Sequence, residues 1–188
     1  MSKTIIYFIR HAESPFIFGE ELTRPLSKRG KSDALLVKNK LSDINFDQFI
    51  SSSYQRAKET IEPLANGKYI KLFNELREKA LKGQFAIEYD EIEQAIKKSF
   101  QDRDYKLSGG ESTNEVQKRS IPIILNILND SSLSTVAIGT HGNILTGILN
   151  YFDKTFGFDF WKNSSKPDIY KCDFNGVKLL SVERIKFY

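Results

Sequence analysis

The stretch TIIYFIRHAES, residues 4–14, decides the class of fold. It begins as a continuous apolar run, which is typical of a strand that is buried on both faces of a parallel sheet. The run ends abruptly at Arg10 and His11, although the chain contains only two histidines. The other, His141, ends a second strand-like run, STVAIGT, residues 134–140. Because both histidines stand at the end of a strand-like run, the sequence favours a chemical role for both.

Strand-like and helix-like segments alternate along the rest of the chain. Further strands are expected over residues 46–52 and 69–73, and helices over residues 28–41, 54–65, 111–130 and 142–152. A hairpin is expected over residues 168–185, turning at Asn175 and Gly176, a pair that favours a tight hairpin turn. Alternation of this kind predicts an α/β fold, a three-layer α/β/α sandwich with a mostly parallel central sheet.

Two of these helices carry more specific signals. In the helix after Ser27, a suitable N-cap, the buried face is expected to hold Ala34, Leu35, Val37 and Leu41. In the helix over residues 111–130, either Ser112 or Thr113 serves as the cap. Pro122 either kinks this helix or marks its true start.

Residues 78–110 depart from the alternation. They are rich in charge, and residues 88–104 read as one amphipathic helix. We expect this segment to be a small inserted cap over the edge of the sheet where the active site lies. The whole chain, residues 1–188, is otherwise expected to form one domain.

Composition limits the possible partners. The 188 residues are 40% hydrophobic and 28% charged, with a net charge of +4, which suits lysine-rich helix surfaces better than a nucleic-acid interface. The single cysteine, Cys172, excludes an internal disulfide, and no cluster of cysteine and histidine suggests a metal. No segment is apolar and long enough to span a membrane, and the first apolar run is too short for a signal peptide. The sequence therefore predicts a cytoplasmic protein without cofactor, metal, membrane or nucleic-acid partner. The aromatic stretch FGFDFW, residues 156–161, reads as core, edge packing or a homodimer contact.

Polar residues that follow the predicted strands should meet at one edge of the sheet, because ligands of open α/β sheets bind beyond the carboxyl ends of the strands. These residues are Arg10 and His11, Arg56 in SSSYQRAKET, Glu75 and Glu78 in NELREKALKG, and His141 with the amides of Gly142 and Asn143. Two arginines, two histidines and a helix N-terminus together form a site for a dianionic group such as phosphate.

A neutral imidazole in such a site can act as a nucleophile. Attack by His11 on phosphorus would give a phosphohistidine, while a carboxylic acid donates a proton to the leaving oxygen and later takes one from water. Glu78 is the preferred acid because it begins the inserted segment, and Glu75 is its rival. The sequence offers no set of acidic ligands typical of a magnesium phosphatase.

The ordered motifs RHAES, LSKRG, SSSYQRAKET, LRE, GGES and THGN resemble the histidine phosphatase superfamily, the phosphoglycerate-mutase-like proteins. The resemblance runs from about residue 5 to about residue 149. It implies that His11 is the phosphorylated nucleophile, that Arg10, Arg56 and His141 bind the phosphate, and that Glu78 is the proton donor.

The chain departs from the family pattern in the first loop. Ala12 stands where the motif usually has glycine, and Ile17 stands where a side chain of the asparagine type is expected. The loop between His11 and Leu26 is also short. One phosphate contact is therefore expected to be missing or to come from another residue. The stretch GGES is expected to serve as a turn and helix cap, and Glu111 either does only this or also braces a pocket arginine.

The leading hypothesis is a metal-independent phosphomonoesterase that acts on a small phosphorylated substrate. A mutase is the first alternative, but the inserted segment is short for one. A non-catalytic sensor of a phosphorylated ligand is the second. The aromatic residues Phe16, Phe18, Phe85 and Tyr89 form either an apolar wall for the substrate or part of the core.

Overall fold

The fold is a six-stranded sheet with helices on both faces, as a computed structural model of the chain describes it for residues 3–187. The strand order is β3-β2-β4-β1-β5-β6. The strands are β1 (Lys3–Arg10), β2 (Gln48–Ser52), β3 (Ile70–Phe73), β4 (Thr135–Thr140), β5 (Asp168–Asn175) and β6 (Lys178–Arg184). The first four are mutually parallel, while β5 and β6 form an antiparallel hairpin beside β1. The predicted α/β class and mostly parallel sheet are confirmed.

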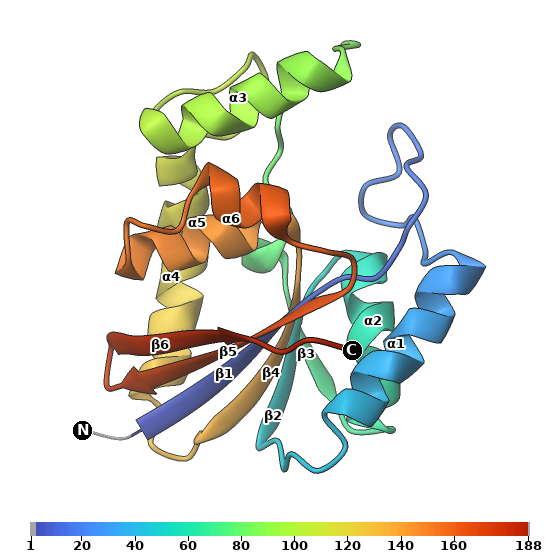
Figure 1. The fold of residues 1–188 in the computed structure, drawn as a ribbon, viewed down its shortest axis with the longest axis vertical. Coiled ribbons are helices and arrows are strands. Elements are labelled where there is room, and N and C mark those ends of the chain that lie inside the picture. Colours follow the sequence, from blue (N-terminus) through green and yellow to red (C-terminus); the bar gives the residue numbers. More distant parts are fainter. Residues whose placement is uncertain (1–2, 188) are drawn as a thin grey trace.

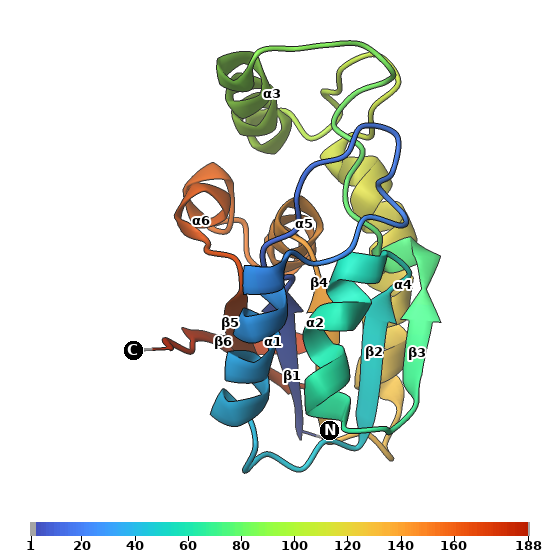
Figure 2. The same cartoon turned by 90° about the vertical axis from the view of Figure 1, so that its right-hand side faces the viewer.

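Two helical layers cover the sheet. Helices α1 (Lys28–Lys40) and α2 (Gln55–Ala65) lie on one face, and α4 (Thr113–Asn129) and α5 (Gly142–Phe152) lie on the other (Figures 1 and 2). Alternate residues of β1 enter the two cores, because successive side chains of a strand point to opposite faces. Ile6 and Phe8 join the core under α4 and α5, whereas Tyr7 and Ile9 join the one under α1 and α2. This double burial explains the continuous apolar run of the first strand.

The helices differ from expectation in two details. Ala34, Val37 and Leu41 are buried as predicted, but Leu35 is 53% exposed, since it lies about 100° around the helix from Ala34. Helix α4 is capped by Ser112, which forms a reciprocal capping box with Glu115. Pro122 lies inside α4 and does not mark its start.

The segment over residues 78–110 stands beyond the carboxyl edge of the sheet. Its helix α3 (Tyr89–Gln101) lies above α5 and the short helix α6 (Phe158–Asn163) (Figure 1). Thr113 at the start of α4 donates from Oγ1 to the carbonyl of Ser99 at 2.6 Å, and Lys79 packs beneath Phe100. These contacts fix the inserted helix to the top of α4.

Two further observations concern single residues. Cys172 is a fully buried residue of β5. Trp161 is half-buried and packs on Phe158, with 5.8 Å between ring centroids. Within residues 3–187, no helix combines the length and apolarity that crossing a membrane requires.

Candidate active site

The two histidines lie side by side, each directly after the end of a strand. Arg10 at the end of β1 pairs in register with Thr140 at the end of β4, so the next residue of each strand is a histidine. The backbone N–H of His11 donates to the carbonyl of Thr140 at 2.9 Å, and the two imidazole centroids are 5.2 Å apart. Parallel strand pairing alone therefore brings together two residues that are 130 positions apart (141 − 11).

The His11 ring is fixed in one orientation and one tautomer. Its Nδ1 lies 2.7 Å from the carbonyl oxygen of Ala12. Because a carbonyl only accepts hydrogen bonds, Nδ1 must carry the proton and Nε2 keeps its lone pair. Burial and then the neighbouring Arg56 guanidinium hold the pKa of His11 well below its usual value. The imidazole is therefore neutral at neutral pH and presents a free nucleophilic nitrogen.

Ala12 fits this arrangement without strain. Its N–H donates to Oγ1 of Thr60 at 3.0 Å, and its side chain is fully buried. Among residues 3–187, Asn66 is the only non-glycine residue with a positive φ. The backbone at position 12 therefore does not require the glycine of the usual motif.

His141 is oriented by the end of β2. Its Nε2 lies 2.8 Å from Oγ of Ser52, which accepts the N–H of Tyr54 at 3.2 Å. The Ser52 hydroxyl can donate its proton to Nε2, and in that tautomer the ring proton is on Nδ1. Nδ1 is buried and has no partner among residues 3–187, so in that tautomer it can donate to a ligand. Burial, Arg56 and the other nearby cations lower the pKa of His141 as well.

Arg10 packs closely against the start of α5. Its Nη1 donates to the carbonyl of Ser164 at 3.1 Å and to the hydroxyl of the same residue. A Cβ on Gly142 would lie 2.8 Å from Nη2 and 2.9 Å from Cζ of Arg10. Glycine at position 142 is therefore what allows the guanidinium to approach the helix N-terminus.

Arg56, in the first turn of α2, is the largest fully buried side chain of the described residues and is 1% exposed. Its Nη1 donates to the carbonyl of Glu21 at 2.6 Å and its Nη2 to Oε2 of the same residue at 3.0 Å. The guanidinium carbon lies 4.9 Å from the centroid of the Tyr54 ring. The junction between β2 and α2 thus supplies a serine, a tyrosine and an arginine to one edge within five residues of sequence, Ser52–Arg56.

Glu78 occupies the N-terminus of α5. Its two carboxylate oxygens accept the amides of Ile144 at 3.0 Å and Asn143 at 3.2 Å. The Asn143 amide was expected to be open to phosphate, but in the structure it donates to a carboxyl oxygen of Glu78, because an oxygen acceptor is attracted to the positive end of the helix. The rival acid, Glu75, has an exposed side chain. Of the two candidates, Glu78 is the one whose carboxyl group contacts the first turn of α5, directly after His141.

A clamp on α4 holds the segment that carries Glu78. The Arg119 guanidinium donates to the carbonyls of Glu75, Arg77 and Glu78. Glu111 accepts from Arg119 at 2.8 and 2.9 Å and from Arg77 at 2.9 Å. Glu111 thus braces two arginines of this clamp, whereas the sequence suggested a pocket arginine.

Four aromatic residues of the first loop and the inserted segment lie at the surface. Phe16, Phe18, Phe85 and Tyr89 are all exposed, so none is a core residue. The Lys82 ammonium lies 6.0 Å from the centroid of Phe18 and 4.9 Å from that of Phe85, which joins the first loop to the inserted segment.

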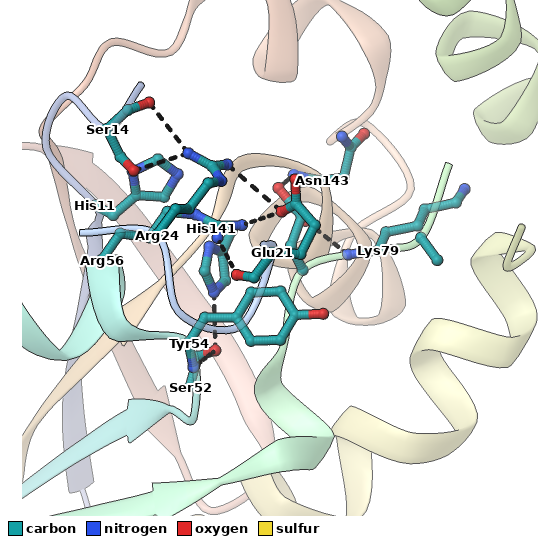
Figure 3. Close-up of polar contacts among 12 residues, drawn as sticks. His11, Ser14, Glu21, Arg24, Ser52, Tyr54, Arg56, Lys79, His141 and Asn143 are labelled. Atoms are coloured by element: carbon teal, nitrogen blue, oxygen red, sulfur yellow. Dashed lines mark hydrogen bonds and ion pairs between the residues drawn. The ribbon is translucent and has the colours of Figure 1, made fainter. Parts of the chain in front are cut away.

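Sequence reasoning missed two residues that Figure 3 shows among the histidines and arginines, Glu21 and Arg24. Arg24 is only 9% exposed, although it lies in a loop. Both come from ELTRP, a stretch with no periodicity and no familiar motif. The only signal in the sequence was Ile17. Because it stands where a phosphate-binding side chain is expected, another residue had to supply that contact.

The residues at this edge suit an anion better than a metal. Among residues 3–187, no group of three or more histidine, cysteine, aspartate or glutamate side chains is placed to hold a metal ion. The buried polar atoms without a partner there include the Nε atoms of Arg10, Arg24 and Arg56 and Nδ1 of His141. All four are nitrogen atoms that can donate to an oxyanion.

Comparison with known proteins agrees with this arrangement. The family described as the histidine phosphatase superfamily (branch 1) matches residues 6–174. No curated protein matches the chain in sequence.

Three solved structures illustrate the shared fold. A mycobacterial glucosyl-3-phosphoglycerate phosphatase is 18% identical with a TM-score of 0.75, covering 97% of both chains. YhfR of Bacillus stearothermophilus is 24% identical with a TM-score of 0.72, covering 94% of both. A phosphoglycerate mutase of Bacillus anthracis is 17% identical with a TM-score of 0.77, covering 98% of this chain and 93% of that one. At these identities the likeness establishes the fold alone.

Proposed function

The chain belongs to the histidine phosphatase superfamily (branch 1), and on that premise we propose that it is a metal-independent phosphomonoesterase acting through a phosphohistidine on Nε2 of His11. The family includes phosphatases and mutases among its structural neighbours. The proposal selects hydrolysis because the inserted segment over residues 78–110 is short, whereas a mutase must retain its product and return the phosphoryl group to it.

The observation that carries the proposal is the state of His11. Its Nδ1 is bound to the Ala12 carbonyl at 2.7 Å, and burial with nearby cations keeps the ring neutral. A neutral imidazole with one nitrogen fixed and the other free is prepared for in-line attack on phosphorus. The surrounding guanidinium groups stabilise the charge on the phosphoryl oxygens during transfer.

The reaction takes two balanced steps. In the first, the Nε2 lone pair of His11 forms a bond to phosphorus, the bond to the ester oxygen breaks, and protonated Glu78 gives its proton to that oxygen. In the second, water attacks phosphorus, Glu78 takes a proton from the water, and the P–N bond breaks to release inorganic phosphate. Glu78 therefore ends the cycle protonated, as it began.

The contacts of Glu78 agree with this exchange of roles. Its carboxylate is held by the amides of Asn143 and Ile144 next to the histidines. When a substrate phosphate takes the end of α5, the Glu78 carboxyl is freed from these amides and can turn to the ester oxygen. The proposed substrate is a small phosphorylated molecule of the cytoplasm.

The test is hydrolysis of para-nitrophenyl phosphate between pH 5 and 8 in the presence of EDTA. We expect turnover that EDTA does not change and that His11→Ala abolishes. A phosphoenzyme trapped by rapid quench should be labile in acid and stable in base, as a phosphoramidate is, and absent from the variant.

Other outcomes would contradict the proposal. Activity that EDTA removes would exclude the metal-free route. Phosphate binding without turnover of any phosphate ester would favour a sensor, and transfer of the phosphoryl group to a second hydroxyl compound in preference to water would favour a mutase.

A further inference from the structure

The first loop brings a third buried arginine to the two predicted ones. Arg24 donates from Nη1 to Oγ of Ser14 at 2.8 Å and to the carbonyl of Ser14 at 3.1 Å, which fixes its side chain across the loop. Its Nη2 lies 3.5 Å from Oε2 of Glu21, and the same oxygen lies 3.0 Å from Nη2 of Arg56. One carboxylate oxygen therefore joins two buried guanidinium groups beside the histidines (Figure 3).

Positive charge is in excess at this place. Arg24 and Arg56 are each close enough to lower the pKa of His141, and Arg10 does the same. Lys166 adds a further cation, because its charge contributes to the lowered pKa of His11. Bringing buried cations together is unfavourable unless an anion neutralises them. The carboxylates that face these cations are those of Glu21 and Glu78, with Asp168 acting on Arg10 as well.

Position 17 explains why a further cation is needed. Ile17 replaces the amide side chain that the motif leads one to expect, and it is 39% exposed and unable to donate a hydrogen bond. Arg24 lies seven residues further along the same loop (24 − 17) and directs its guanidinium inward. It is therefore placed to supply the missing donor.

From these contacts we propose that Arg24 is a third phosphate-binding arginine, and that the Glu21 carboxylate is a placeholder that the substrate phosphate displaces from Arg24 and Arg56. This inference rests on the proposed function of the site. The Glu21 side chain is 42% exposed, whereas that of Arg56 is 1% exposed. Glu21 can therefore move into solvent without repacking the core, and the arginines stay where they are.

The placeholder has a definite consequence for binding. Phosphate must compete with an internal carboxylate, so removing the Glu21 charge should strengthen binding while removing Arg24 should weaken it. A residue that only braced the loop would not give opposite signs for the two changes. The pair of substitutions therefore separates a binding role from a structural one.

The experiment is calorimetric titration of the full chain with inorganic phosphate at pH 7.5. We expect Arg24→Met to raise the dissociation constant about tenfold or more, the loss typical of a charge-assisted hydrogen bond. We expect Glu21→Gln to lower it about two- to fivefold, as removal of a partly exposed ion pair allows. Arg29→Met and Glu20→Gln are the matched controls, because both side chains are exposed and each makes the same change of charge nearby.

The outcomes distinguish this inference from the proposed function. Failure of the wild-type chain both to bind phosphate and to hydrolyse any ester would overturn both. An active wild type whose phosphate affinity is unchanged in Arg24→Met, or is weakened by Glu21→Gln, would overturn the inference alone. If Arg24→Met unfolds the loop, seen as a lowered melting temperature, the Glu21→Gln result still decides about the placeholder, and Arg24→Lys tests whether charge at position 24 restores affinity.

Discussion

At the scale of single residues, the close approach of Arg10 to Gly142 can be tested most directly. We predict that Gly142→Ala lowers kcat/KM by about tenfold or more, because an added Cβ would lie 2.8 Å from Nη2 of Arg10 and must displace the guanidinium. The melting temperature should not fall, since alanine is the better helix former and φ at position 142 is not positive. Steady-state kinetics and thermal unfolding of the same preparation check both parts.

Gly147→Ala is the matched control for that prediction. It adds the same methyl group to the same helix, but the new Cβ would lie 3.5 Å from Cγ1 of Val116, an ordinary contact. Its kinetics should stay close to those of the wild type. Equal losses in the two variants would mean that α5 tolerates no added volume and that Arg10 is not the cause.

At the scale of elements, the clamp between α4 and the segment before the inserted helix positions the proposed acid. Arg119 binds three carbonyls of residues 75–78 and Glu111 fixes Arg119, so Arg119 is a positioning residue for Glu78. We predict that Arg119→Met lowers kcat/KM for an alkyl phosphate by about 10- to 100-fold, because a misplaced acid cannot protonate a poor leaving group. The loss of kcat/KM for para-nitrophenyl phosphate should be about threefold or less, since nitrophenolate leaves without a proton and kcat/KM does not include the later hydrolysis of the phosphohistidine.

The dependence on the leaving group separates positioning from general damage. Lys118→Met removes one positive charge from the neighbouring, exposed position of α4 and should change neither rate. A parallel loss on both substrates in Arg119→Met would show that the clamp only stabilises the fold.

The sequence predicted the helices and strands, but it did not predict the contacts made by the loops between them. Periodicity located the helices and strands because burial imposes a repeat on them, and the strand ends then placed His11, Arg56 and His141 at one edge. Glu21 and Arg24 lie in a loop that has no repeat, so their approach to Arg56 follows only from the folded path of residues 11–27. The contact of Glu78 with the Asn143 and Ile144 amides depends in the same way on where the inserted segment turns.

At the scale of the whole molecule, the way in which the sheet assembles the site lowers the stability of the fold at acid pH. Parallel pairing of β1 with β4 buries two imidazoles among cations, and both pKa values are held well below the usual value near 6.5. In the unfolded chain both histidines titrate normally. Below pH 6.5 the unfolded state therefore binds more protons than the folded state, and the free energy of unfolding must fall as the pH falls.

We predict a loss of stability on acidification from pH 7 to pH 5 with a limiting slope of about 1.4 kcal/mol per pH unit for each histidine. The loss between pH 7 and pH 5 is due to the histidines. Carboxylates with lowered pKa values, such as Glu111, lose their contribution to the free energy of unfolding only at lower pH, below the usual glutamate value. Urea unfolding at half-unit steps of pH, in buffer free of phosphate, measures the slope. The paired variant His11→Asn/His141→Asn should show a nearly flat profile over the same range, whatever its absolute stability. A wild-type slope equal to that of the paired variant would mean that the folded chain accepts these protons, and that His11 is not kept neutral for attack.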